Sequence, residues 1–241
     1  MRNGNSWLVA FEKHTGKVAW KVQRNYETPR EGDHSYATPI VTQQNGREAI
    51  LVWGAERFTA HAATDGGLLW SCAGFNPKAK NNWVVVASFA VVDEMAVIPY
   101  GRGARLAGIA LNGEGDVTQT HRKWTLENQG TFVPSPAAHD GKVYLVRDRG
   151  EVLCVNPKNG TLHWQAAFPK NRNNYYSSPT IADGKIYAAR EDGVLFVASI
   201  KDGFKQLTEN NLGERLIASP VPVNGSLLIR GEKHLFSFRK K

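Results

Sequence analysis

Five residues in turn-rich segments of this 241-residue chain have side chains suited to holding a ligand. They are His34, Trp83, Asn174, Tyr175 and Arg215. Aromatic rings give a recognition surface its contact area, and amides orient a ligand. If the fold brings these segments together, the five residues form a binding face. The alternative is that the polar groups are ordinary loop residues and that the rings pack between neighbouring elements.

The sequence offers little support for catalysis by its own side chains. It lacks the Gly-x-Ser-x-Gly pattern of a nucleophilic serine and any glycine-rich phosphate loop. Asp33 and His34 form an acid–base pair only if their loop turns the two side chains toward each other. The 2 cysteines and 7 histidines show neither Cys-x-x-Cys nor His-x-x-x-His spacing. We therefore expect no catalytic residue and no metal site, and we expect Cys72 and Cys154 to be buried free thiols.

Short strands in a repeated unit must position the candidate residues. The segment from Ser135 to Trp164 contains one complete unit. A two-residue turn at Asp140-Gly141, a second turn ending at Gly150 and a longer turn from Asn156 to Gly160 separate four strands. Four short antiparallel strands in about thirty residues are typical of one β-propeller blade.

The same unit recurs along the chain. A serine or threonine begins five copies, followed by proline in all but the second, at Thr38, Ser88, Ser135, Ser178 and Ser219. The starts are 50, 47, 43 and 41 residues apart, close to the roughly 40–50-residue period of propeller blades. A closing tryptophan, which we expect to be a core residue, recurs at Trp20, Trp70, Trp124 and Trp164.

These repeats predict an all-β fold, a β-propeller of four-stranded antiparallel blades in a single domain, 1–241. Four complete blades are expected at about 35–71, 84–125, 132–167 and 175–208, with partial blades at 6–22 and 216–238. The loops that lead into the first strands form one face around the channel mouth, and they contain the five candidate residues. Because an open arc exposes its end blades, we expect association or poor solubility unless the partial blades complete each other.

Two segments carry a resemblance to a known family. The sequences FEKHTGKVAW at 11–20 and VNPKNGTLHW at 155–164 resemble the A-x-D-x-x-T-G-x-x-x-W motif of pyrroloquinoline-quinone-type propeller repeats. The resemblance covers nearly the whole chain and is strongest to the BamB-like outer-membrane assembly propeller group. It implies seven or eight blades, an export signal and a periplasmic or extracytoplasmic location. Since the sequence begins without an apolar signal stretch, we expect an amino-terminally truncated member.

The resemblance implies a non-catalytic scaffold of the bacterial cell envelope that binds a protein or another polymer and needs no cofactor. Quinone-dependent dehydrogenases share the blade, so the second reading is part of such an enzyme, with pyrroloquinoline quinone and calcium. Those enzymes use a catalytic aspartate, several calcium ligands and a vicinal disulfide. Here Cys72 and Cys154 cannot be vicinal, and the loops offer few carboxylates, chiefly Glu31, Asp33 and Glu214. This comparison favours the scaffold.

The net charge of +8 comes from the two ends of the chain. Met1 to Arg24 and Arg230 to Lys241 each hold five basic residues and one acidic residue, so the middle is balanced. This distribution argues against nucleic-acid binding, which needs a contiguous basic stripe, and favours a solvated basic rim. No apolar run is long enough to insert into a membrane. An insertion at 112–121 is expected to be a long hairpin, the alternative being a calcium loop.

Overall fold

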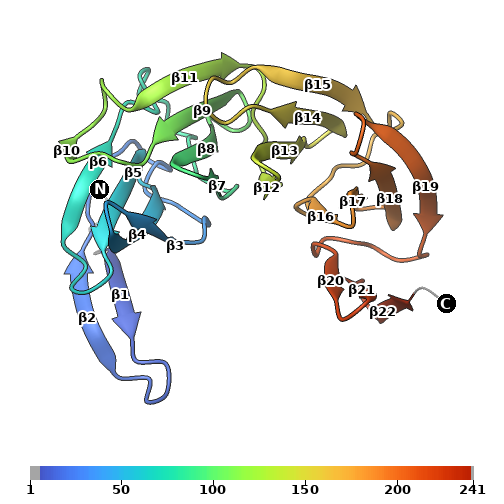
Figure 1. The fold of residues 1–241 in the computed structure, drawn as a ribbon, viewed down its shortest axis with the longest axis horizontal. Coiled ribbons are helices and arrows are strands. Elements are labelled where there is room, and N and C mark those ends of the chain that lie inside the picture. The colour runs from blue at the N-terminus through green and yellow to red at the C-terminus, as the bar shows by residue number, and fades with distance from the viewer. Residues whose placement is uncertain (1–5, 240–241) are drawn as a thin grey trace.

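A computed structural model describes residues 6–239, which form strands and turns with no helix. Figure 1 shows the sheets following one another around an open arc. Each of the four complete sheets has antiparallel strands joined in chain order, and a smaller sheet lies at each end. The prediction of an all-β propeller with four complete and two partial blades is confirmed. Arg2, Lys240 and Lys241, which belong to the expected basic rim, lie outside the described residues.

The strand bounds show how the repeat is built. The first sheet contains β1 (Trp7–Phe11) and β2 (Val18–Gln23). The complete sheets contain β3 (Ile40–Gln44), β4 (Arg47–Gly54), β5 (Arg57–Ala62) and β6 (Leu68–Cys72); β7 (Ala90–Val92), β8 (Met95–Tyr100), β9 (Arg105–Ala110) and β11 (Arg122–Glu127); β12 (Ala137–His139), β13 (Lys142–Val146), β14 (Glu151–Val155) and β15 (Leu162–Ala167); and β16 (Thr180–Ala182), β17 (Lys185–Ala189), β18 (Val194–Ser199) and β19 (Lys205–Asn211). The last sheet contains β20 (Val221–Val223), β21 (Ser226–Arg230) and β22 (Leu235–Arg239).

The two end sheets remain separate. β1 pairs only with β2, and β22 pairs only with β21, among the residues that the structure describes. Figure 1 shows a gap between these two ends of the arc. The partial blades therefore do not complete each other by strand pairing, and the expected association or poor solubility stays a prediction.

A bulge in the outer strand pair identifies which half of a blade β1 and β2 represent. In the complete sheet β12–β15, Trp164 pairs with Cys154, and the register shifts at Val155. In the first sheet, Trp20 pairs with Ala10, and the register shifts at the next residue in the same way. β1 and β2 are therefore the third and fourth strands of a blade.

The recurrent tryptophan docks one blade against the next. The Trp20 indole N–H donates to the Ala63 carbonyl at 2.9 Å, and that of Trp124 donates to the Pro157 carbonyl at 2.8 Å. Both acceptors lie in the turn before the next blade's fourth strand. In the second of these contacts the ring lies against Gly160, where φ is +76° and an added Cβ would lie 2.8 Å from the indole. The glycine of the repeat motif thus allows the tryptophan ring to approach the backbone closely, and it also adopts the left-handed conformation of the turn.

The hydroxyl residue that starts each unit joins the inner strands in a ladder across the blades. Each of the first four start residues donates its backbone N–H to the side-chain hydroxyl of the next start residue. The donor–acceptor pairs are Thr38 with Ser88 at 2.9 Å, Ser88 with Ser135 at 2.9 Å, Ser135 with Ser178 at 2.9 Å, and Ser178 with Ser219 at 3.0 Å. The repeat therefore conserves an interblade contact along the chain, because these bonds hold each loop to its neighbour.

The insertion at 112–121 differs from the expected hairpin. Its strand β10 (Gly115–Asp116) pairs in parallel with β6 of the preceding blade. Val117 is buried in that blade's core, and the Thr118 hydroxyl accepts a hydrogen bond from the Ala73 backbone at 2.9 Å. The hairpin prediction was wrong because burial of Val117 holds the segment against its neighbour as a strap.

Candidate functional site

The loops before the first strands run side by side, as the propeller prediction requires. Ser35 forms a parallel bridge with Val85, and the Val85 backbone N–H donates to the His34 carbonyl at 3.1 Å. These contacts bring the loop of His34 next to the loop of Trp83. The His34 imidazole lies 3.5 Å from the Asp33 carboxylate, so the two side chains do turn toward each other. Both are partly exposed, which leaves them accessible to a partner.

Trp83 closes a joint between blades and shows only part of its ring at the surface. Its indole N–H donates to the Phe75 carbonyl at 2.7 Å. The ring lies against Gly101, where an added Cβ would lie 2.7 Å from it. The Lys80 ammonium group lies 4.7 Å from the ring centroid, a cation–π arrangement. The hydrogen bond to Phe75 and the contact with Gly101 therefore hold the Trp83 ring in a fixed position.

Asn174 and Arg215 form a second group, joined by Glu191. The Asn174 backbone and side-chain N–H groups donate to one Glu191 oxygen at 2.8 and 3.1 Å. The Arg215 guanidinium lies 3.6 Å from the other oxygen. About half of the Arg215 side chain is exposed, so this group presents a positive charge at the surface.

Tyr175 does not belong to the binding face. It is only 1% exposed, and its ring stacks on Phe168 with centroids 5.9 Å apart. Burial raises the pKa of its hydroxyl. The prediction was wrong because neighbouring residues of an extended segment point in opposite directions, so Tyr175 enters the core while Tyr176 accepts a hydrogen bond from Asn174 at 3.1 Å.

The loops that lead into the first strands form one surface of the protein, the loop face. Carboxylates of this loop face hold backbone groups in place. Asp148 accepts hydrogen bonds from the Phe132 and Val133 N–H groups at 2.8 and 3.1 Å. Glu214 does the same for Lys233 and His234 at 2.6 and 3.1 Å. Within 6–239, no three His, Cys, Asp or Glu side chains are placed to hold a metal ion. Calcium needs several oxygen ligands that converge on one point, and the Asp148 and Glu214 carboxylates instead hold backbone groups of two different loops.

The two cysteines are free and buried, as predicted. Burial raises the pKa of the Cys72 thiol and of the Cys154 thiol, so both stay protonated near neutral pH. They occupy strands of different blades and pack as small apolar residues.

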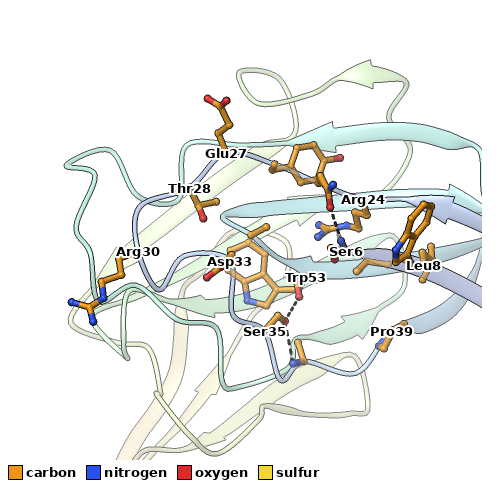
Figure 2. Close-up of a pocket in the computed structure, with 16 residues that line it drawn as sticks. Ser6, Leu8, Arg24, Glu27, Thr28, Arg30, Asp33, Ser35, Pro39 and Trp53 are labelled. Atoms are coloured by element: carbon orange, nitrogen blue, oxygen red, sulfur yellow. Dashed lines mark hydrogen bonds between the residues drawn. The ribbon is translucent and has the colours of Figure 1, made fainter. Parts of the chain in front are cut away.

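A cavity of about 1370 Å³ lies between the first, two-stranded sheet and the next blade. Figure 2 shows its lining, which comes from the start of β1, the end of β2, the following loop and β4. The lining residues include Ser6, Trp7, Leu8, Arg24, Tyr26, Glu27, Arg30, Asp33 and Trp53. Apolar groups and charged groups of both signs therefore meet in this cavity, beside the edge of the first sheet.

Arg24 is a buried cation in this cavity, although the sequence placed it on a solvated basic rim. It is 7% exposed, and its guanidinium donates to the Thr59 hydroxyl at 3.1 Å and to the Gly54 and Arg57 carbonyls at 3.0 Å. Burial lowers the pKa of Arg24 to about 10. One pattern could have revealed this position: Arg24 follows Trp20 by four residues, as the core residue Phe168 follows Trp164.

Comparison with known proteins agrees with this fold. BamB from Moraxella catarrhalis matches 96% of this chain and 78% of its own length, with 16% identity and a TM-score of 0.66. Saccharomyces cerevisiae Sqt1 matches 98% of this chain and 67% of its own length, with 10% identity and a TM-score of 0.68. The computationally designed protein Ika8 matches 96% of this chain and 70% of its own length, with 10% identity and a TM-score of 0.63. Since identity is low, these matches show the fold alone.

No curated protein matches the sequence. Residues 6–239 contain no helix with the length and hydrophobicity of a membrane span. The family model described as outer membrane protein assembly factor BamB matches residues 115–239, more than half of the chain. The expected resemblance is confirmed, and the chain belongs to this BamB family of propeller proteins.

Proposed function

We propose that this protein is a non-catalytic propeller scaffold that binds a protein or another polymer at its loop face, in the periplasm of a bacterial cell envelope. Membership of a family described as an outer membrane protein assembly factor carries the proposal. An arc of blades presents a continuous surface, which suits the binding of another macromolecule.

The chemistry of the loop face supports a macromolecular partner. His34, Trp83, Asn174 and Arg215 lie on loops held by the interblade ladder and by carboxylate caps, so they are positioned before a partner arrives. Exposed Tyr36 adds a second ring to the same surface. A surface that combines rings, amides and an arginine on a rigid frame is typical of protein recognition.

We also propose that the protein works without pyrroloquinoline quinone or calcium. The loop-face carboxylates Asp148 and Glu214 accept backbone N–H groups, and Glu191 is held by Asn174 and Arg215. Each oxygen of these three carboxylates thus already has a partner within the protein. The residues present thus favour surface recognition over cofactor chemistry.

A pulldown from extract of the native cell tests the proposal, with the whole chain as bait. His34→Ala combined with Arg215→Ala removes exposed groups and is expected to reduce capture of the partner about tenfold, as loss of two interface contacts would. The matched control combines Arg47→Ala and Lys142→Ala, which lie at turns on the opposite rim. Unchanged capture by the loop-face variant, together with loss in the control, would contradict the proposed face.

A further inference from the structure

Two loops of the loop face carry the same short motif. Residues 77–83 read PKAKNNW, and residues 169–175 read PKNRNNY. Each copy supplies two cations, two adjacent asparagines and a final aromatic ring, which lies against a glycine of a nearby turn, Gly101 or Gly150. Blade β12–β15 lies between the two blades that these loops precede (Figure 1). The ring thus anchors each loop, and the cations before it stay at the surface.

The cations of the two motifs join two arginines in one positively charged track. Arg102 lies in the turn between β8 and β9, and Arg149 lies in the turn between β13 and β14. The Trp83 ring, with the Lys80 ammonium group 4.7 Å from its centroid, contacts the turn of Arg102. The exposed members of this cationic track are Lys78, Lys80, Arg102, Arg149, Lys170 and Arg172.

Contacts continue the cationic track from one blade to the next. The Arg102 guanidinium lies 4.2 Å from the centroid of the Phe132 ring. The Phe132 backbone N–H donates to the carboxylate of Asp148, the neighbour of Arg149 in its turn. Arg149 donates from Nη1 to the Arg172 carbonyl at 2.6 Å. The track is therefore one connected surface, although its members come from four separate segments of the chain.

Carboxylates do not neutralise the cationic track. The loop segments that build it contain a single acidic residue, Asp148, and both of its oxygens accept backbone N–H groups. These segments are 76–83, 101–105, 128–134, 147–150 and 169–176. Among residues 6–239, none of the six track cations forms an ion pair with a carboxylate. Their charges are therefore available to a partner.

The opposite rim of the same blades mixes both signs of charge. Its turns carry Asp93, Glu94 and Asp140 together with Lys142 and Lys158. The middle of the chain is balanced along the sequence, so only the fold separates a one-sign surface from a mixed one. Solvated surfaces usually mix both signs, whereas a one-sign surface attracts and orients an oppositely charged partner.

We propose that the cationic track binds an acidic segment of a partner polypeptide, whose glutamate and aspartate side chains pair with the track cations. The exposed amides of Asn81 and Asn82 supply donors and acceptors for the peptide groups of that segment. The inference rests on the proposed function, because it names the chemistry of a partner at the same loop face. A second copy of this chain offers no such segment, since its acidic residues occur at most two in a row.

Nucleic acid and a membrane surface fit the cationic track less well. Single-stranded nucleic acid binds where bases stack on open ring faces, and here Lys80 and Arg102 lie over the rings of Trp83 and Phe132. Binding to a membrane surface needs apolar side chains beside the cations. In the described part of the chain, none of the large exposed apolar residues lies in the track segments.

Fluorescence anisotropy of a labelled acidic peptide tests the track. The peptide alternates glutamate and serine over about sixteen residues, and the whole chain is titrated into it. We expect saturable binding of one peptide per chain that weakens as salt is added, and no binding of the matching glutamine–serine peptide. Arg102→Gln combined with Arg149→Gln should weaken binding about tenfold, because two ion pairs of up to a few-fold each are lost.

The matched control removes the same charge from the opposite rim. Lys142→Gln combined with Lys158→Gln should leave the affinity for the acidic peptide unchanged. Carbodiimide coupling then locates the bound peptide, because it joins peptide carboxyl groups to nearby lysines. Mass spectrometry is expected to find the peptide on Lys78, Lys80 and Lys170 and not on Lys142 or Lys158.

Four results would overturn the inference. They are no binding of the acidic peptide, equal loss of affinity in the two double variants, coupling mainly at the opposite rim, and tighter binding of a phosphate-bearing probe. The phosphate-bearing probes are labelled oligothymidylate and phosphatidylglycerol vesicles at the same ionic strength. Tighter binding of either would assign the track to nucleic acid or to a membrane.

The pulldown with His34→Ala and Arg215→Ala separates this inference from the proposed function. If that variant loses its partner while the acidic peptide fails to bind, the loop face stands and the acidic partner is wrong. If the peptide binds at the track while the pulldown is unchanged, the track stands and the assignment of His34 and Arg215 is wrong.

Discussion

The strand pairs β14–β15 and β1–β2 share one register but differ sharply in burial. Trp164 pairs with Cys154 and Trp20 pairs with Ala10, each followed by the same bulge. In the complete blade, Val155 after the bulge is fully buried, whereas the corresponding Phe11 is 61% exposed. Local sequence thus sets strand pairing, while neighbouring strands supply the burial that stabilises a blade.

A matched pair of leucine substitutions should show the largest difference between these regions. Leu153→Ala in β14 removes a fully buried side chain and is expected to lower the free energy of unfolding by about 2–5 kcal/mol. Leu8→Ala in β1 removes a half-buried one and should cost about 1 kcal/mol or less. Urea unfolding followed by circular dichroism measures both. Equal losses would mean that β1 is as well packed as β14.

His61 allows a further test of the comparison between complete and partial blades. It follows the bulge in the complete blade β3–β6, as Phe11 does in the first sheet. It is 3% exposed, and burial lowers its pKa, with hydrogen bonds to Gly66 and Thr59. Below an unfolded-state pKa of about 6.5, the unfolded chain binds a proton that the folded chain does not. Stability should therefore fall as pH falls below about 6.5, by at most about 1.4 kcal/mol per pH unit from this group.

The measurement for His61 is urea unfolding at pH 7.5, 6.5 and 5.5. His61→Gln keeps a polar side chain and should reduce the dependence of stability on pH over this range. If wild type and variant lose stability in parallel, the buried imidazole is not the source of the dependence.

Substitutions in the interblade ladder should have the smallest effect on stability. Ser135→Ala in the middle of the arc leaves the Ser88 N–H without its acceptor and should cost about 1 kcal/mol. Thr38→Val at the end of the ladder removes a hydroxyl that accepts nothing among the described residues, so it should change stability little. Thermal unfolding compares the two. A larger loss for Thr38→Val would show that its hydroxyl already has a partner.

The sequence predicted the blades well because each carries its own turns, and three of the four complete blades have a tryptophan in the fourth strand, Trp70, Trp124 or Trp164. Asp140-Gly141 and Gly160 need left-handed backbone, which few residues adopt, so the turns could be located from composition. The strap at Val117 was missed, because pairing with β6 depends on a surface contributed by another blade. Contacts between distant segments leave no local pattern in a single sequence.

The candidate site was predicted less completely. The loops of His34 and Trp83 do lie together, and Asn174 and Arg215 do meet through Glu191. Neighbouring residues of an extended segment point in opposite directions, and the sequence alone did not show which of Tyr175 and Tyr176 enters the core. Arg24 was missed because charge suggested exposure, while its place after Trp20 is a core position.

Titration of the purified chain with pyrroloquinoline quinone and calcium tests the scaffold account most directly. Uptake of the quinone is followed by its absorbance, and activity by reduction of a dye in the presence of an alcohol. The account predicts no stoichiometric uptake and no alcohol-dependent reduction, because both oxygens of the loop carboxylates Asp148 and Glu214 accept hydrogen bonds from backbone N–H groups. Stoichiometric uptake at low micromolar affinity with alcohol-dependent dye reduction would contradict it and assign the chain to a quinone-dependent dehydrogenase.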